Sequence, residues 1–224
     1  MILYTHFKYS ALIFSVLAML LTASCSNSVN DNDDEILIKN LPQIDPFMYK
    51  PDSVNYAVWL DRKQSDGRFI REPINIIIVD SRAKDSLDAI ARLLTAFTLA
   101  DFPPRFGHTG GYFGKMDGKL NHQQPSVSQH AFSDYMWAFT NNHARIFGPY
   151  KVENAYYWIG SSSRERGISH DYVSFDRARN DLANMLVSKA NAVVISQISL
   201  NNKLDDSEFS TGDHDGKATM IKLN

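Results

Sequence analysis

The sequence contains very little cysteine, with Cys25 the single one in 224 residues. A lone cysteine excludes an internal disulfide, so side-chain packing has to stabilise the fold. Long apolar runs are equally scarce. After residue 21, none approaches the roughly 20 residues that a helix needs to cross a bilayer. We therefore expect no second membrane span beyond the N-terminal segment.

Positive charge is not in excess. Beyond residue 24 the chain carries 22 lysines and arginines against 25 aspartates and glutamates, a net charge near −3. Nucleic-acid binding and polybasic lipid recognition both depend on a basic surplus. The sequence therefore predicts no nucleic-acid partner.

Complete catalytic motifs are also absent. The chain has no phosphate-binding Gly-x-x-x-x-Gly-Lys-Ser/Thr, no dinucleotide-binding Gly-x-Gly-x-x-Gly between a strand and a helix, and no His-Glu-x-x-His. It also lacks the nucleophile motif Gly-x-Ser-x-Gly. No cofactor or metal is specified by motif.

The N-terminus, in contrast, has a recognisable pattern. Lys8 precedes an apolar run, Tyr9 to Leu21, and small residues then lead to Cys25. This pattern predicts a secretory signal peptide over residues 1–24. A lone cysteine there resembles the lipobox of bacterial lipoproteins, which implies lipidation (palmitate) of Cys25 and, with Ser26 following, the periplasmic side of the outer membrane. Two alternatives stay open, namely a free cysteine beside an Ala-x-Ala cleavage site and an uncleaved anchor.

The remaining chain divides into a polar segment and a folded part. Residues 25–46 are rich in asparagine and aspartate with little to bury, which predicts a lipidated, disordered tether. Residues 47–224 alternate strand and helix patterns, and a glycine-rich irregular stretch over 102–131 is typical of a binding loop or lid. We expect one α+β domain, a mixed β-sheet with about two main helices packed on one face. The predicted segments are strands 54–60, 74–79, 144–147, 155–160, 193–200 and 218–223, a helix after Asp80-Ser81 with Leu87, Ile90, Ala91 and Leu94 on its inner face, and a helix capped by Asp176.

Polar residues gather beside the predicted strands of the second half, where a scaffold displays functional groups. Histidine, aspartate and arginine together are able to hold a metal or an anion. The candidates are His143, Arg145, Arg164, His170, Asp171, Asp213 and His214. Each also has a structural interpretation: a partly buried strand histidine, a solvated charged turn, or a tight Asp-His-Asp-Gly turn before the last strand.

Four segments of this region, taken in combination, carry a resemblance to a known protein family. Together they resemble the LssY-like C-terminal domain family, an uncharacterised bacterial module often joined to membrane-embedded phosphatase-type or DedA-type domains. The resemblance spans about residues 70–224 and implies an α+β fold without an established activity. The chain departs from the family over 105–140 and where the family has paired histidines. The segments are the opening strand 73–79, the His-x-Arg strand 143–147, the Trp-x-Gly-Ala-Ala/Ser motif at 158–164 and the closing Thr-Asp-Gly turn and strand at 211–223.

These observations favour an envelope lipoprotein whose LssY-like domain is a binding or accessory module. Its expected partners are the membrane, through the N-terminal lipid, and an envelope protein or an anionic small ligand. The alternative is a metal-assisted, phosphoesterase-like hydrolase in the periplasm that uses the candidate histidines, aspartates and arginines. A third interpretation, a purely structural protein, predicts no pocket near the strand ends.

Overall fold

A strand buried on both faces organises the domain. In the computed structural model, which describes residues 31–224, strand β3 (Ile76–Asp80) has no exposed residue. Ile76 and Ile78 pack into one apolar cluster, whereas Ile77 and Val79 pack into another on the opposite side. The near-continuous β-branched run over 74–79 predicted this strand, and the prediction is confirmed.

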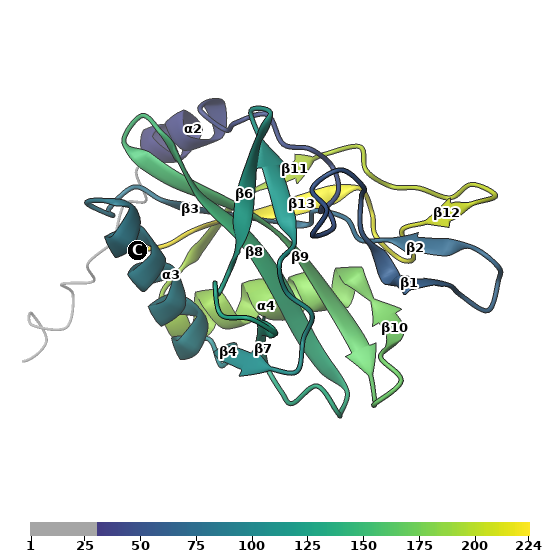
Figure 1. Ribbon diagram of the computed structural model, residues 1–224. Coiled ribbons are helices and arrows are strands. Elements are labelled where there is room, and N and C mark those ends of the chain that lie inside the picture. The colour runs from purple at the N-terminus through teal and green to yellow at the C-terminus, as the bar shows by residue number, and fades with distance from the viewer. Residues whose placement is uncertain (1–30) are drawn as a thin grey trace, which may run out of the picture. The chain divides into compact units, whose positions relative to one another are not determined.

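The helices and strands, labelled as in Figure 1, follow one another along the chain. Within residues 31–224, no helix combines the length and apolarity needed to span a bilayer. The elements are α2 (Asp31–Lys39), β1 (Val58–Lys63), β2 (Phe69–Arg71), β3 (Ile76–Asp80), α3 (Ser86–Leu99), β4 (Pro104–Phe106), β5 (Phe113–Met116), β6 (Lys119–Gln124), β7 (His130–Ser133), β8 (Asn141–Val152), β9 (Ala155–Arg166), β10 (Asp171–Ser174), α4 (Phe175–Ala190), β11 (Val193–Ser199), β12 (Phe209–Ser210) and β13 (Lys217–Lys222).

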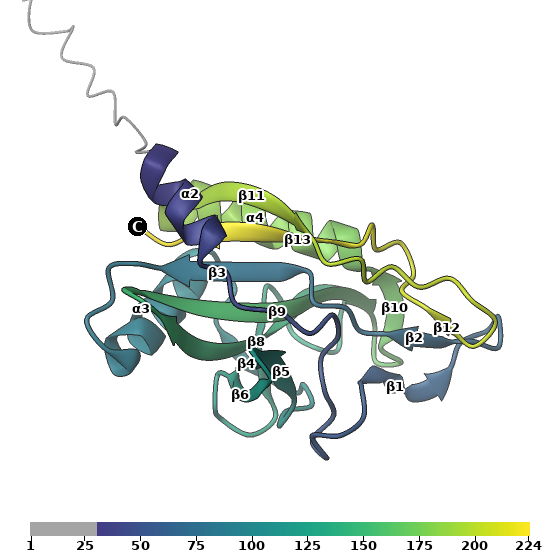
Figure 2. The same cartoon turned by 90° about the horizontal axis from the view of Figure 1, so that it is seen from above.

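Two sheets form the scaffold. The larger has the strand order β11-β13-β3-β9-β8-β6-β5, with β10 added beside β9 and the β4–β7 pair beside β8. It is mixed, because β13 and β3 are parallel while β3, β9 and β8 are antiparallel neighbours. The smaller sheet, β1-β2-β12, lies at the end of the domain away from α3 (Figures 1 and 2). The expected α+β architecture with a mixed sheet is confirmed.

The two main helices cover one face of the large sheet. Residues of α3 and α4 share an apolar cluster with Ile76, Ile78 and Trp158. The other face is not left open, since Leu37 of α2 packs there with Ile77 and Tyr157. The expectation that helices lie on one face therefore holds for α3 and α4 but misses α2.

The folded unit begins earlier than expected. Asp34–Asn224 form one compact unit. Leu37 is 7% exposed and accepts a 3.0 Å hydrogen bond from the Tyr157 hydroxyl through its carbonyl oxygen, and Ile44 forms a β-bridge with Met116. Residues 34–46 thus belong to the domain rather than to a tether, because Leu37 and Ile44 supply apolar contacts that the polar composition conceals. The predicted signal peptide (1–24) and Cys25 lie outside the described residues.

Helix α3 starts one turn later than its sequence pattern indicated. Its N-cap is Asp85, whose carboxylate accepts hydrogen bonds from the backbone N–H groups of Leu87 and Asp88. The Asp80 carboxylate instead pairs with Arg92. The inner face is formed by Ala89, Leu93, Ala96 and Phe97, while Leu87 is exposed.

Candidate functional site

A cavity lies between the large sheet, the small sheet and the loop after β4. Its volume is about 250 Å³. The expectation of the purely structural interpretation, that no pocket lies near the strand ends, is therefore not met. The cavity is lined by Trp59, Leu60, Asp61, Glu72, Gly107, His108, Thr109, Tyr112, His143, Arg145, Glu165 and His170.

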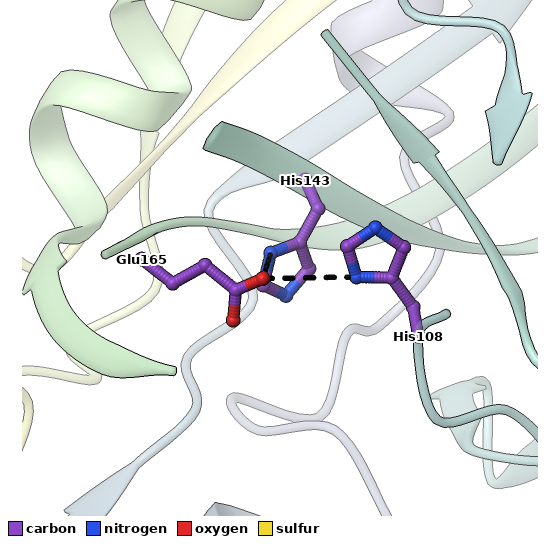
Figure 3. A group of neighbouring side chains, drawn as sticks. All are labelled: His108, His143 and Glu165. Carbon is purple, nitrogen blue, oxygen red and sulfur yellow. Dashed lines mark ion pairs between the residues drawn. The ribbon is translucent and has the colours of Figure 1, made fainter. Parts of the chain in front are cut away.

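The Glu165 carboxylate lies among three histidines of this cavity. Its Oε1 atom lies 3.8 Å from Nδ1 of His143 and 3.9 Å from Nδ1 of His108, and its Oε2 atom lies 2.8 Å from Nδ1 of His170. Figure 3 shows the carboxylate directed at the first two imidazoles. Asn141 also donates a 3.0 Å hydrogen bond to Oε1. One buried carboxylate therefore has three histidines around it.

Strand periodicity explains why these residues converge. Side chains two residues apart in a strand point to the same face. On β8, Asn141, His143 and Arg145 therefore share the face away from α3 and α4. On the neighbouring β9, Asn141 is opposite Glu165 and His143 is opposite Ser163. The site is thus built on the most extensive strand pair in the sheet, a rigid support.

His108 reaches the site from the glycine-rich loop. Gly107 has φ +101°, and a Cβ there would lie 2.0 Å from Cδ1 of Trp137. Only glycine permits both this backbone conformation and this close approach. The indole of Trp137 in turn stacks on the ring of His170, with centroids 5.6 Å apart. The stretch 102–131 is more regular than expected, because it contains β4, β5, β6 and the start of β7. The binding-loop role of this stretch stays a prediction.

Burial controls the protonation of the two inner histidines. Burial, with a further contribution from the positive charge of Arg145, lowers the pKa of His108 to about 3 and the pKa of His143 well below its usual value. Both imidazoles are therefore neutral near pH 7 and each has one nitrogen lone pair. Within residues 31–224, Nδ1 of His143 and Nε2 of His108 have no hydrogen-bond partner.

Arg145 occupies the other side of His143. Its Nη1 atom lies 3.3 Å from Oε2 of Glu72 and 3.2 Å from Nε2 of His143, and its Nη2 atom donates to the Thr109 hydroxyl at 2.9 Å. Guanidinium only donates hydrogen bonds. The contact with His143 therefore favours the tautomer with a lone pair on Nε2 and the proton on Nδ1. Burial raises the pKa of Glu72, and the charge of Arg145 opposes that shift.

Ser163, His143 and Glu165 have an order similar to that of a serine-hydrolase triad. The Ser163 hydroxyl lies 3.1 Å from Nε2 of His143. Ser163 is fully buried, however, and in the described structure it is not part of the cavity wall. A nucleophile has to reach its substrate. This arrangement therefore orients His143 rather than providing a nucleophile.

The cavity favours a cation. Asp61, Glu72 and Glu165 contribute three carboxyl groups to its wall, whereas Arg145 is the one arginine or lysine among the lining residues. His108, His143 and Glu165 each offer a ligand atom, and these atoms all lie within 4.8 Å of one another. Neutral imidazole and carboxylate are the ligands of catalytic Zn²⁺ and of non-haem iron.

The structure brings together three of the seven sequence candidates, namely His143, Arg145 and His170. Arg164 is next to Glu165 in sequence, so it points to the opposite face of β9. There it donates to Asn142 at 3.0 Å and lies 3.8 Å from the Asp181 carboxylate on α4. Asp171 is an exposed residue that pairs with Arg62 and Ser169. Neither Arg164 nor Asp171 is part of the cavity.

Asp213 and His214 lie at the start of α4 instead. The Asp213 carboxylate accepts hydrogen bonds from the Tyr172 hydroxyl at 2.6 Å and from the backbone N–H of Phe175 at 2.8 Å. The N-cap of α4 is Ser174, whose hydroxyl accepts a 2.9 Å hydrogen bond from the backbone N–H of Arg177. The expectation that Asp176 caps this helix is therefore wrong, because Asp176 lies inside the first turn, and Asp213 supports the cap from outside the helix. His214 is fully buried with Nε2 on Oδ1 of Asn202 at 2.7 Å, and it forms a second cluster with Asp176 and Asp215. Arg179 pairs with both carboxylates of this cluster, at 2.7 Å from Asp215 and 3.4 Å from Asp176.

Sequence reasoning missed three residues of the site: His108, Glu165 and Glu72. Glu165 lies beyond the predicted strand 155–160, and its face becomes known only from the observed register. Because β8 and β9 pair at His143 and Ser163, residue 165, not 164, lies on the side of His143. His108 was visible as a histidine inside the glycine-rich segment. Glu72 had no local signal, since it meets Arg145 from 73 residues away.

Comparison with known proteins identifies no relative of the chain. No protein-family model matches the chain, and no curated protein or solved structure matches it.

Proposed function

We propose that the domain is a metal-assisted hydrolase with its centre at His108, His143 and Glu165. One observation carries the proposal: two neutral, buried imidazoles face the same carboxylate oxygen at 3.8 and 3.9 Å. Two ligand atoms of a tetrahedral zinc ion lie about 3.3 Å apart when each is about 2.0–2.1 Å from the metal. The two histidine-to-carboxylate distances would therefore have to shorten by about half an ångström, and the two imidazoles would also have to approach each other, since the three ligand atoms lie within 4.8 Å of one another.

The remaining lining residues suit hydrolysis of a phosphate ester. A metal-bound water is a nucleophile near neutral pH. Glu165 holds Nδ1 of His170, which leaves Nε2 of that ring as the base. In the proposed step the water oxygen bonds to phosphorus and its proton passes to His170. The bond from phosphorus to the alcohol oxygen then breaks, and the proton passes to the departing alkoxide. Arg145 supplies positive charge for the phosphoryl oxygens.

The test uses the chain from residue 25 with Cys25→Ser, which retains every residue of the compact unit. Titration calorimetry with Zn²⁺ and phosphate release from p-nitrophenyl phosphate are measured together. We expect one ion per chain and metal-dependent turnover. Glu165→Gln and His108→Asn should each lower metal affinity at least tenfold, whereas His122→Asn, which changes an exposed histidine, should not. Absence of metal binding, or unchanged affinity in Glu165→Gln, would reject the proposal.

A binding module for an anionic ligand is the second candidate. The contact between Arg145 and Nε2 of His143 favours it, because a proton on Nδ1 prevents that nitrogen from binding a metal. This candidate predicts that inorganic phosphate binds without added metal and that Arg145→Gln abolishes the binding. Turnover that requires metal would instead exclude a module that only binds.

The cellular setting proposed for this domain is the periplasmic side of the outer membrane. The sequence pattern around Cys25 supports a lipid anchor, and the LssY-like segments correspond to β3, β8, β9 and the β12–β13 region. Mass spectrometry of the mature protein tests the anchor, because lipidation adds acyl mass at Cys25. A free thiol there would remove this part of the proposal.

A further inference from the structure

Exposed apolar side chains are concentrated on the loops next to the cavity. Fourteen large apolar residues are exposed in the described part of the chain, and five of them lie on three chain segments, namely the end of β4, the β7–β8 loop and the β9–β10 turn. These five, Phe106, Tyr135, Met136, Phe139 and Ile168, are named here the apolar collar. Their exposed fractions range from 50% to 73%. Isolated exposed apolar residues are ordinary, but a group beside a polar cavity indicates a binding surface.

Trp137, on the β7–β8 loop, contacts residues next to the other two segments. Its indole lies against Gly107, the residue that follows Phe106, and stacks on His170, two residues after Ile168. Gly107 and His170 are both part of the cavity wall. The β7–β8 loop that carries Trp137 and the β9–β10 turn also lie at the same end of the sheet (Figure 1). Trp137 therefore connects the three segments that carry the collar to two residues of the cavity wall.

The collar and the cavity differ sharply in polarity. Residues 135–142 contain no charged side chain. The cavity wall, in contrast, contains three carboxyl groups, three histidines and Arg145. A ligand that contacts both surfaces needs a polar end and an apolar end.

We propose that the substrate is an amphiphile, an alkyl phosphate ester whose head enters the cavity while its chain lies on the apolar collar. This inference rests on the proposed function, because it names the substrate class of the same site. The collar then supplies binding energy that a short ester does not obtain. Each methylene transferred from water to an apolar surface improves binding by about fourfold.

The experiment compares ethyl phosphate with decyl phosphate, below its micelle concentration, using the zinc-loaded chain from residue 25 with Cys25→Ser. Phosphate release gives kcat/KM, and quenching of tryptophan fluorescence gives the dissociation constant. We expect kcat/KM to be at least tenfold higher and the dissociation constant at least tenfold lower for decyl phosphate than for ethyl phosphate, a decyl-to-ethyl preference ratio of at least ten in both measurements. Met136→Ser and Ile168→Ser should each lower this ratio at least threefold. Leu87→Ser, which changes an exposed leucine on α3, should leave the ratio unchanged.

The outcomes separate the two proposals. Hydrolysis of both esters at equal kcat/KM overturns the amphiphile inference and leaves the hydrolase intact. Tighter, collar-dependent binding of decyl phosphate without hydrolysis supports the apolar collar and rejects the hydrolase. Equal binding of both esters without hydrolysis rejects both. A dimer in sedimentation that Met136→Ser dissociates, with no dependence on chain length, assigns the collar to a second copy of the chain and also overturns the inference.

Discussion

Nη1 of Arg145 lies 3.2 Å from Nε2 of His143, two residues earlier on the same face of β8. If Nδ1 of His143 bound a metal, Nε2 would have to carry the proton of the ring. The guanidinium beside Nε2 only donates hydrogen bonds, so it opposes that arrangement. The Ser163 hydroxyl, 3.1 Å from the same nitrogen, is able either to donate a hydrogen bond to Nε2 or to accept one from Nε2–H. Arg145 therefore favours the tautomer with the proton on Nδ1, whereas Ser163 is compatible with both tautomers, including the one that metal binding at Nδ1 requires.

Removal of the guanidinium should strengthen metal binding. In Arg145→Gln, Nε2 of His143 is free to donate to Ser163, and a positive charge beside the metal is lost. We expect the zinc affinity from calorimetry to rise about tenfold, equivalent to about 1.4 kcal/mol. Turnover should fall, because the phosphoryl oxygens lose a positive partner. Arg164→Gln is the matched control, since that guanidinium is on the opposite face. An unchanged or weaker zinc affinity in Arg145→Gln would contradict the tautomer argument.

Stability should decrease on acidification through the buried histidines. The pKa is lowered to about 3 for His108 and to about 4 for His214, with burial as the first cause in both. In the unfolded chain a histidine has a pKa of about 6.5, so the unfolded state binds more protons below that pH. The free energy of unfolding should therefore fall as the pH drops from 6.5 to 4, by about 1.4 kcal/mol per pH unit for each histidine.

Urea unfolding at several pH values measures this dependence. His108→Gln and His214→Gln should each reduce the slope by the contribution of one histidine. His122→Gln, at an exposed position, serves as the control and should leave the slope unchanged. Equal slopes in all three variants would show that burial does not control these protonation states.

Gly107→Ala should disturb the stack of Trp137 on His170. The new methyl group would lie 2.0 Å from the indole, and the backbone has φ +101°. We expect a destabilisation of about 2–4 kcal/mol and a shift in tryptophan emission, because both conformational strain and overpacking contribute. Gly67→Ala is the control, since its φ is +82° but nothing lies within 4 Å of the added atom. Equal losses in the two variants would mean that the approach of Trp137 adds nothing.

Two neighbouring residues test where the folded unit begins. Leu37 is 7% exposed and Ile36 is 53% exposed. Leu37→Ala should lower the free energy of unfolding by about 2–3 kcal/mol, because it opens a cavity in the core. Ile36→Ala should change it by about 0.5 kcal/mol or less. Unfolding in guanidinium measures both. A Leu37→Ala protein as stable as the parent would indicate that residues 34–46 belong to the tether and not to the folded domain.

The sequence alone determined the features that depend on local pattern. The β-branched run before Asp80 specified a buried strand. The closing strands β11 and β13 were also visible from their composition. His143, Arg145 and His170, which the structure places around one cavity, were candidates because polar residues at strand ends are a local signal. In each case the side chains that carry the information are close in the chain.

Tertiary structure decided which of those polar residues form a site. A strand reverses its faces with every residue, so a choice between Arg164 and Glu165 depends on the register with β8 and not on residue type. Glu72 and His108 reach Arg145 and Glu165 only after the small sheet and the loop after β4 pack on the large sheet. The sequence determined the supply of functional groups and most of the scaffold, whereas long-range packing determined that three histidines surround one carboxylate.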